Sequence, residues 1–582
     1  MDLINKWEHV KSRRNPEQLH SISKYLLEMA TVYAMPGSSL EKDPILLQDL
    51  IGALDWFYEQ HYHAGKQAYG NWWPWEMKGP KVERIYQWVL TSFAPFLYKG
   101  AVMDMVSGRS VTRKEGEYGQ GDHGRGREII HSILLLCQSA PTSYVQEYQA
   151  LIKYMIQSDT FVPYLERIEE IGLYQLAKKI VEDPAILAKN PENDHKQFPN
   201  MDRVVHHQKD FAFGIASHST RTGNYEGMNG ENVRGWYSGD GMTYLYNGDL
   251  SHYTDYWITV HPYRMPGTTE DTEIRKENSG QNPLGRSWVG GTWIGTNGIW
   301  GMDFASWDES LTAKKGWFLF QDKIIALGAG ISSQKKGVRV ETIVENRKFS
   351  PKECIPIFYG NHEEEHSFTW EKRETQKTNW VHVTGPTSHS DIGYYFPTTG
   401  SLCLDWKERT GSYKALYDPT VETFVTHHYF EMWLDHGQQP CNDSYAYVIL
   451  PNRSKEETKG YGAHSDFEIL SNTKEVQAVY DQGLKILGIL FWENKKQQVD
   501  FITCDHQAAV MIQEEGDHLT IAISDPTMEN EFIDLKINRK ACKVLFCDSN
   551  IQVDLQEESV GIRVYVKGLR GQRSRITIKT LV

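Results

Sequence analysis

The first part of the chain carries apolar residues at helical spacing. One apolar stripe comprises Leu19, Ile22 and Leu26, and a second comprises Leu47, Leu50, Ile51, Leu54 and Phe57. Recurrence every three or four residues is the period of a helix with one buried face. The pattern predicts helices over most of residues 17 to about 188.

A further helix is expected around residue 150. Ser143 and Gln146 have the spacing of a capping box. They precede an apolar run at helical spacing, formed by Tyr148, Leu151, Ile152 and Met155. The polar, proline-bearing stretch KNPENDHKQFPN at 189–200 then interrupts the pattern, and we interpret it as a linker.

Beyond residue 200 the period of the apolar positions changes to two, as in strands with one buried face. Three runs show it: Val338, Val340, Thr342 and Val344; Leu519, Ile521 and Ile523; and Ile562, Val564 and Val566. Helices that precede strands indicate separate domains rather than a βαβ fold. We expect an α+β multidomain protein with a helical domain at 1–190, a central β-sandwich at 200–465 and a C-terminal β-sandwich at 466–582.

Composition narrows the function. A chain of 582 residues with 40% hydrophobic content is large enough for about three cores. The net charge of −14 argues against a nucleic-acid partner, which needs a broad basic surface. No stretch has the length and apolar character of a membrane span, and the N-terminal MDLINKWEHVKSRR lacks the apolar core of an export signal. The seven cysteines have no paired CxxC spacing, so we expect neither a disulfide framework nor a zinc site.

NWWPWE at 71–76 is a candidate sugar-binding patch. It places Trp72, Trp73 and Trp75 within four residues, beside Asn71. On a helix these rings cannot all face one core, although core packing remains the alternative. Indole faces stack on the apolar side of a sugar ring, and an amide can bind its hydroxyls.

Arg109 and Arg113, in MDMVSGRSVTRKEG, are four residues apart, so in a helical turn both guanidinium groups point the same way. Such a pair suits carboxylates, with Glu115 and Glu117 as possible competitors and an ordinary surface ion pair as the alternative.

The amide-rich and aromatic segment 224–257 is typical of a rigid loop that carries a site. Within it, Glu226 could fix an arginine and Asn229 a substrate carboxylate, or the loop could satisfy itself through Asx turns. Glu226 and Glu231 also leave open a glycoside hydrolase, which uses two facing carboxylic acids. The arginines nearby fit an anionic ligand better.

Four segments together carry a resemblance: NWWPWE, FAPFLYKGAVMDMVSGRSVTR, NYEGMNGENVRGWYSGDGMTYLYNGDLSHYTDYW and HPYRMPGTTED. They closely resemble polysaccharide lyase family 8, which includes the hyaluronate, chondroitin AC and xanthan lyases. The resemblance implies an incomplete α/α toroid followed by antiparallel β-sandwich domains. It also implies β-elimination on an acidic polysaccharide, with Arg109, Arg113, Glu226 and Asn229 at the catalytic site and Asn71, Trp72 and Trp73 binding substrate.

The sequence departs from this family at the proton-transfer segment. The family's catalytic Asn, His and Tyr lie between the NWW motif and the helix before the arginines, and here NWWPWEMKGP leads directly into KVERIYQWVLTSFAP. Several toroid helices are therefore expected to be missing. Tyr118 and His123 are the nearest substitutes for the acid and base, although a Tyr or His in a glycine-rich loop usually has a structural role.

Three interpretations follow: an active lyase, a catalytically silent carbohydrate-binding relative, or an internally deleted product with exposed apolar helix faces. The expected partner is an acidic polysaccharide, with no nucleic acid or membrane. We expect no metal or cofactor, a monomer, and, from the resemblance, an extracellular location.

Overall fold

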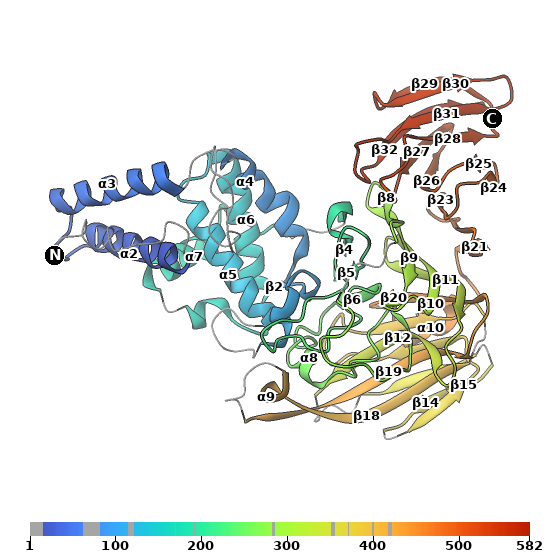
Figure 1. Ribbon diagram of the computed structural model, residues 1–582, viewed down its shortest axis with the longest axis horizontal. Helices are drawn as coiled ribbons and strands as arrows, with labels where there is room; N and C mark the ends of the chain where they lie inside the picture. Colours follow the sequence, from blue (N-terminus) through green and yellow to red (C-terminus); the bar gives the residue numbers. More distant parts are fainter. Residues whose placement is uncertain are drawn as a thin grey trace. The chain divides into compact units, whose positions relative to one another are not determined.

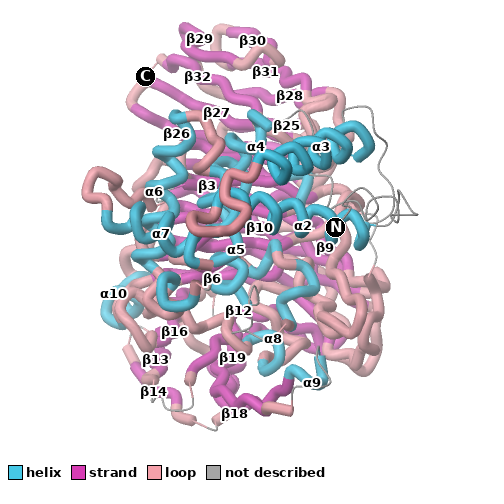
Figure 2. The backbone as a smooth tube through the Cα atoms, turned by 90° about the vertical axis from the view of Figure 1, so that its left-hand side faces the viewer, coloured by secondary structure: helices cyan, strands magenta, loops and turns pink. Residues whose placement is uncertain are grey.

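The computed structural model describes residues 16–61, 82–113, 121–168, 170–190, 194–281, 286–350, 355–361, 363–370, 372–398, 401–416 and 422–581. They belong to two compact units, residues 1–92 and 93–582. Helices occupy the start of the chain (Figure 1), and strands predominate after residue 194 (Figure 2). The expected order of helices followed by antiparallel sheets is confirmed. The bounds of the three expected domains remain a prediction.

The first unit contains α2 (Pro16–Ala34), α3 (Pro44–His61) and α4 (Val82–Trp88), and the π-helix η1 (Val89–Phe93) runs into the second. Asp43 caps α3, because its Oδ1 accepts the backbone N–H groups of Ile45 and Leu46, each at 2.8 Å. Among the described residues, no helix is long and apolar enough to cross a membrane.

The buried face of α3 differs from the expected stripe. Leu50 is buried against Ile22 and Leu26 of α2, and Leu46 packs beside it. Ile51 and Leu54 lie on the other side, with exposed fractions of 51% and 54%. The apolar residues of α3 surround much of the helix, so periodicity alone did not determine which side faces α2.

The second unit begins with short elements and three helices: η2 (Ala94–Phe96), β1 (Leu97–Tyr98), β2 (Ala101–Val102), η3 (Asp104–Val106), η4 (Gly108–Thr112), α5 (Gly121–Leu136), α6 (Thr142–Ser158), η5 (Tyr164–Arg167) and α7 (Ile171–Glu182). The apolar run of α6 is buried as predicted. The capping box is wrong: the N-cap is Pro141, without a side-chain cap, and Ser143 lies inside the helix.

A four-stranded sheet of order β3-β4-β5-β6 follows the helices. Its strands are β3 (Asp194–Phe198), β4 (Arg203–Gln208), β5 (Phe211–Ala216) and β6 (Met242–Tyr246), with η6 (Pro199–Met201) between the first two. β3 pairs antiparallel with β4. The predicted linker is therefore wrong over residues 194–198, where charged residues alternate with buried His195 and Gln197 on an edge strand.

Two larger sheets form the central part. The nine-stranded sheet has the order β14-β13-β16-β17-β20-β11-β10-β9-β8, and the five-stranded sheet has the order β15-β18-β19-β12-β7. The elements are α8 (Tyr256–Thr259), β7 (Thr269–Asp271), β8 (Val289–Ile294), β9 (Asn297–Ala305), β10 (Leu311–Phe320), β11 (Lys323–Ser333), β12 (Arg339–Phe349), β13 (Ile357–Gly360), β14 (Glu365–Phe368), β15 (Arg373–Gln376), β16 (Trp380–Val383), β17 (Ile392–Tyr395), β18 (Leu402–Ser412), α9 (Tyr413–Leu416), β19 (Phe424–Gln438), β20 (Asp443–Pro451) and α10 (Lys455–Tyr461).

β12 was expected to bury one face, but nearly all its residues are buried. The alternate charged positions are neutralised by partners. Glu341 binds Arg264 through both carboxylate oxygens, at 2.8 and 3.0 Å. A buried charge is tolerated when it is paired in this way. The charged residues that alternate with apolar ones in β12 are therefore buried and paired, and they do not form a solvated face.

The C-terminal part has two sheets, of order β21-β22-β23-β26-β27-β32-β29 and β24-β25-β28-β31-β30. The strands are β21 (Phe467–Asn472), β22 (Val476–Asp481), β23 (Ile486–Phe491), β24 (Gln497–Val499), β25 (Ile502–Cys504), β26 (Ala508–Glu515), β27 (His518–Ser524), β28 (Phe532–Ile537), β29 (Ala541–Cys547), β30 (Ile551–Leu555), β31 (Val560–Tyr565) and β32 (Ser574–Thr580). In β31 the predicted alternation is confirmed. Trp288, just before β8, packs on Trp492, just after β23, with ring centroids 4.1 Å apart. One apolar cluster thus extends from the central sheets into the C-terminal sheet.

Candidate functional site

The two predicted arginines lie at the end of a short 3-10 helix. Arg109 belongs to η4, and Arg113 follows its last residue in extended conformation. Gly108 begins η4 with φ +56°, a left-handed conformation that favours glycine. The expected helical turn is therefore present, in its tighter form.

Both arginines bind one buried carboxylate. The Nε hydrogens of Arg109 and Arg113 are each donated to a different oxygen of Glu231, both at 2.8 Å. The Glu231 side chain is 8% exposed, whereas the arginine side chains are 30% and 32% exposed. Arg109 also donates from Nη1 to Glu226 at 2.5 Å. The expected competitors Glu115 and Glu117 lie outside the described residues. Glu231, which joins the two arginines, was expected to act only in the glycoside-hydrolase alternative.

Asn229 lies in a tight turn on the same loop. Met228 and Glu231 form an antiparallel bridge, with backbone hydrogen bonds of 3.2 and 3.0 Å. Asn229 and Gly230, between them, both have positive φ, +57° and +80°. Asn-Gly is the preferred pair for such a turn. Asn229 is exposed, and its conformation is explained by the turn that presents Glu231 to the arginines.

Asn232 secures this loop to η4. Its backbone N–H donates to the Thr112 hydroxyl at 3.0 Å, and its side chain donates to the Glu226 carbonyl at 2.9 Å. Glu226 and Glu231 are therefore held by both backbone and ion-pair contacts. Because both carboxylates bind Arg109, they do not form the pair of opposed carboxylic acids that a glycoside hydrolase needs.

A second acidic group, Asp104, lies buried behind η4. Its Oδ2 accepts the Trp257 indole N–H at 2.5 Å, and its Oδ1 accepts from Arg125 of α5. Burial raises the pKa of Asp104 to about 7, with the Arg125 charge opposing the shift and Asp122 reinforcing it. Asp104 has no distinguishing sequence pattern, since a lone Asp carries no signal for burial.

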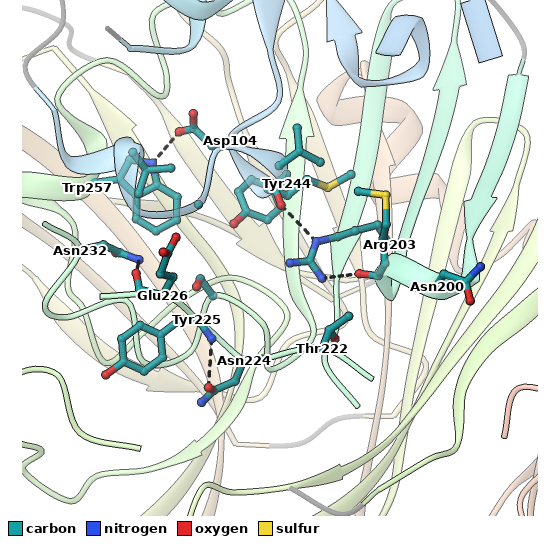
Figure 3. Close-up of a pocket in the computed structure, with 17 residues that line it drawn as sticks. Asp104, Asn200, Arg203, Thr222, Asn224, Tyr225, Glu226, Asn232, Tyr244 and Trp257 are labelled. Atoms are coloured by element: carbon teal, nitrogen blue, oxygen red, sulfur yellow. Dashed lines mark hydrogen bonds between the residues drawn. The ribbon is translucent and has the colours of Figure 1, made fainter. Parts of the chain in front are cut away.

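A cavity of about 430 Å³ opens beside this group. Asp104, Arg203, Glu226, Tyr244 and Trp257 line it, together with other residues of the 222–238 loop (Figure 3). Glu226 is the residue that the cavity shares with the arginine cluster.

The remaining predicted residues are distributed as follows. Asn71, Trp72 and Trp73 lie outside the described residues, and so does Tyr118. His123 is 2% exposed; its Nδ1 lies 2.8 Å from Asp159 Oδ2, and its Nε2 lies 3.1 Å from the Leu250 carbonyl oxygen. With both ring nitrogens engaged, His123 joins α5 to its neighbours and does not face the cavity. Among the described residues, no group of three or more His, Cys, Asp or Glu side chains could hold a metal ion.

Comparison with known proteins gives the family. Residues 193–462 match the super-sandwich domain of polysaccharide lyase family 8, and residues 468–534 match its C-terminal beta-sandwich domain. Its N-terminal alpha-helical domain matches as two stretches, 2–82 and 74–154. The chain belongs to polysaccharide lyase family 8.

Among curated relatives, the family 8 chain is 39% identical to the xanthan lyase of Bacillus sp. (strain GL1) over 504 residues, which are 86% of this chain and 53% of that protein. It is 32% identical to the hyaluronate lyase HylB of Enterococcus faecalis, covering 84% of this chain and 49% of that protein. The chain thus spans about half the length of these relatives.

Among solved structures, Paenibacillus xanthan lyase matches with a TM-score of 0.83 and 29% identity, over 98% of this chain and 66% of that one. The Streptomyces coelicolor chondroitin AC lyase in complex with chondroitin sulphate matches with a TM-score of 0.79 and 23% identity, over 97% and 92% of the two chains, and supports the fold alone.

Proposed function

We propose that the chain is a polysaccharide lyase that cleaves a uronate-containing polysaccharide of the hyaluronan, chondroitin or xanthan type by β-elimination. One observation carries the proposal. Glu231 fixes Arg113 through Nε, and the two terminal nitrogens of Arg113 make no hydrogen bond to the residues that the structure describes. A partly exposed guanidinium oriented in this way can bind a carboxylate with both terminal nitrogens.

The chemistry follows from carboxylate binding. Arg113, with Arg109 on the same Glu231 carboxylate and with Asn229 in the turn that carries Glu231, would neutralise the uronate carboxylate and so make the C5 proton more acidic. A base then removes that proton, and an acid protonates the departing glycosidic oxygen. Glu226 and Glu231 hold the arginines in place. Of the two substitute acid and base candidates, His123 is committed to structural contacts, and Tyr118 lies outside the described residues.

A second candidate is a catalytically silent carbohydrate-binding protein. The match to the N-terminal helical domain in two stretches that meet at residues 74–82 favours it. That is where the sequence lacks the family's Asn, His and Tyr segment. Such a chain would keep the arginine site and bind the polymer, but it would not remove the proton.

One experiment separates the two. The purified chain is incubated with hyaluronan, chondroitin and xanthan while ultraviolet absorbance is followed for an unsaturated uronate, and polymer binding is measured in parallel by calorimetry. A rise in absorbance that is lost in Arg113→Ala supports the lyase. Binding without a rise supports the silent protein. Arg234→Ala, at an exposed arginine of the same loop that pairs with Glu277, is the matched control and should change neither readout.

We further propose that the chain acts outside the cell as a monomer. Polysaccharides of the hyaluronan, chondroitin or xanthan type are encountered outside cells, which supports the extracellular location. Sedimentation of the purified protein and assay of culture medium against lysate test the two statements separately.

A further inference from the structure

The last strand of this acidic chain and the loop before it are positively charged. Residues 559–582 contain six Lys and Arg residues and no Asp or Glu, whereas the whole chain has a net charge of −14. Three of the six pair with a carboxylate, Arg563 with Asp534, Lys567 with Glu531 and Lys579 with Asp517. Such pairs are ordinary on a solvated surface. The other three, Arg570, Arg573 and Arg575, make no ion pair with any residue that the structure describes.

Arg573 and Arg575 lie on one face of the sheet, and each is held on an aromatic ring. Burial alternates along β32, so residues 573, 575, 577 and 579 all face away from the core. Arg573 Cζ lies 4.2 Å from the centroid of the Trp293 ring, and Arg573 Nη1 donates to the Trp293 carbonyl at 2.6 Å. Arg575 Cζ lies 4.3 Å from the centroid of the Phe546 ring. A guanidinium stacked on a ring keeps its remaining N–H donors in a fixed plane, which suits bidentate binding of an anion.

The two guanidinium groups repel each other. Burial lowers the pKa of Arg573, and the positive charge of Arg575 lowers it further, while Asp548 opposes the shift. Asp548 is engaged by the backbone, because its Oδ2 accepts the Arg575 N–H at 2.7 Å. Two neighbouring arginines without a carboxylate between them are stabilised by an anion from outside the chain.

Further basic and hydroxyl groups continue this surface along β32. Lys543 of β29 stands opposite Lys579, and Thr520 of β27 stands opposite Thr577, with 3.1 Å between the two hydroxyl oxygens. Side chains of directly paired residues lie on the same face, and successive positions of that face are about 7 Å apart. We name this surface the basic row, which comprises Arg570, Arg573, Arg575, Lys543 and Lys579. Its extended form suits a linear anionic polymer.

The loop before β32 joins the basic row to the wall of the cavity beside Glu226. Gly571 lies directly against Pro199, since a Cβ at Gly571 would be 2.8 Å from the Pro199 Cβ. Its φ of +73° is also one that favours glycine. The residues after Pro199 in η6, Asn200 and Met201, line the cavity. The exposed residue Arg570, next to Gly571, therefore extends the basic row toward the cavity wall.

We propose that the basic row is a secondary binding surface for an acidic polysaccharide, which holds a stretch of the polymer outside the arginine cluster. Guanidinium groups bind carboxylates and sulfates, and the threonine hydroxyls and the half-exposed ring of Phe546 suit sugar hydroxyls and C–H faces. The proposal rests on the proposed function for the identity of the polymer. A polymer that reaches both sites binds more tightly than a short ligand, because its second contact is intramolecular.

The test compares long and short ligands on the full chain. Calorimetry measures binding of long hyaluronan and chondroitin sulphate, of glucuronate as the short ligand, and of dextran as an uncharged polymer. The double variant Arg570→Ala with Arg575→Ala should weaken polymer binding about tenfold and leave glucuronate binding unchanged. Raised ionic strength should remove the difference between wild type and variant. Unchanged polymer affinity in the variant, or equally tight binding of dextran, would overturn the proposal.

Two controls separate binding from stability. Arg563→Ala removes an arginine that pairs with Asp534 on the other C-terminal sheet, and it should leave polymer affinity within about twofold. Arg570→Ala removes an exposed side chain, so its melting temperature should equal that of the wild type while its polymer affinity decreases. A loss of affinity that disappears after normalisation to the folded fraction would contradict a binding role.

Failure of this proposal is distinguishable from failure of the arginine site. Arg113→Ala should abolish glucuronate binding, while polymer binding persists through the basic row and disappears when Arg570→Ala and Arg575→Ala are added. Glucuronate binding that survives in Arg113→Ala would refute the arginine site and leave the basic row intact. A single-stranded DNA oligonucleotide that binds the basic row more tightly than either acidic polysaccharide would overturn the choice of ligand.

Discussion

Arg113 donates its Nε hydrogen to Glu231 Oε1 at 2.8 Å, although the two residues are 118 positions apart in the sequence. Arg109 takes the other oxygen of the same carboxylate. Glu231 therefore sets the distance and orientation of the two guanidinium groups. The arginine pair is a site because of a third residue, and its properties should respond to changes in that residue.

Replacing Glu231 should loosen the site and destabilise the fold. Glu231→Gln leaves two guanidinium groups without their shared, largely buried carboxylate, and we expect a loss of about 1–3 kcal/mol in the free energy of unfolding. Denaturant titration measures it. Glu226→Gln is the control, because its side chain is 49% exposed and pairs with Arg109 alone. Its cost should be below about 1 kcal/mol. Equal costs for the two variants would contradict the central role of Glu231.

Substitutions at Asn229 separate its turn geometry from its expected role in binding. Asn229→Ala places an ordinary residue at φ +57° and should cost about 1 kcal/mol, whereas Asn229→Gly should retain stability. Stability and polymer affinity are measured on both. If Asn229 binds the substrate carboxylate, the glycine variant keeps its stability and loses affinity. If the turn is its sole role, the glycine variant behaves as the wild type in both assays.

Three buried histidines of β3 and β4 predict acid sensitivity. Burial lowers the pKa of His206 to about 4, and it also lowers the pKa values of His195 and His207. The unfolded chain takes up these protons below about pH 6.5, while the folded chain resists them. The stability that depends on these three neutral histidines is therefore fully present above pH 6.5, and it falls as the pH decreases toward 4.

The slope of that fall approaches about 1.4 kcal/mol per pH unit for each histidine that titrates only when unfolded. Denaturant titrations at several pH values between 7 and 4 measure it. His206→Gln keeps an amide donor for the Gln321 carbonyl, which His206 Nε2 contacts at 2.6 Å, and removes one titrating group. The slope should decrease by about 1.4 kcal/mol per pH unit, the contribution of one such histidine. An unchanged slope would exclude His206 from the acid response.

His123 should behave as a structural residue. His123→Ala removes contacts to Asp159 and to the Leu250 carbonyl from a side chain that is 2% exposed, and we expect a loss of about 2–4 kcal/mol. Any lyase activity, normalised to the folded fraction, should keep the pH profile of the wild type. A profile shifted in this variant at full folding would instead place His123 in proton transfer.

The sequence determined the larger features of the fold because they depend on local periodicity. Helices and strands were placed correctly at α2, α3, α6 and β31 from the spacing of apolar residues alone. The failures have a common origin in partners distant along the chain. β12 was expected to have a solvated face because Arg264, which neutralises Glu341, is not adjacent in the sequence.

The residues of the candidate site also fall into two groups, those that the sequence identified and those that only the structure identifies. Arg109, Arg113 and Glu226 were found from spacing and resemblance, and the structure places Glu226 on Arg109. Tyr244 and Asp104 lack a distinguishing pattern, because only burial beside a cavity separates them from the chain's other tyrosines and aspartates. The substrate-binding role of Asn71, Trp72 and Trp73 stays a prediction.

Trp288 packs at a tilt on Trp492 within one apolar cluster that the central and C-terminal sheets share, so we expect these sheets to unfold together. A protein joined in this way should melt in a single cooperative calorimetric transition across these sheets, although its sequence profile divides near residue 465. Truncation there would uncover the apolar residues of this shared cluster, so residues 466–582 cover part of the core of the central sheets.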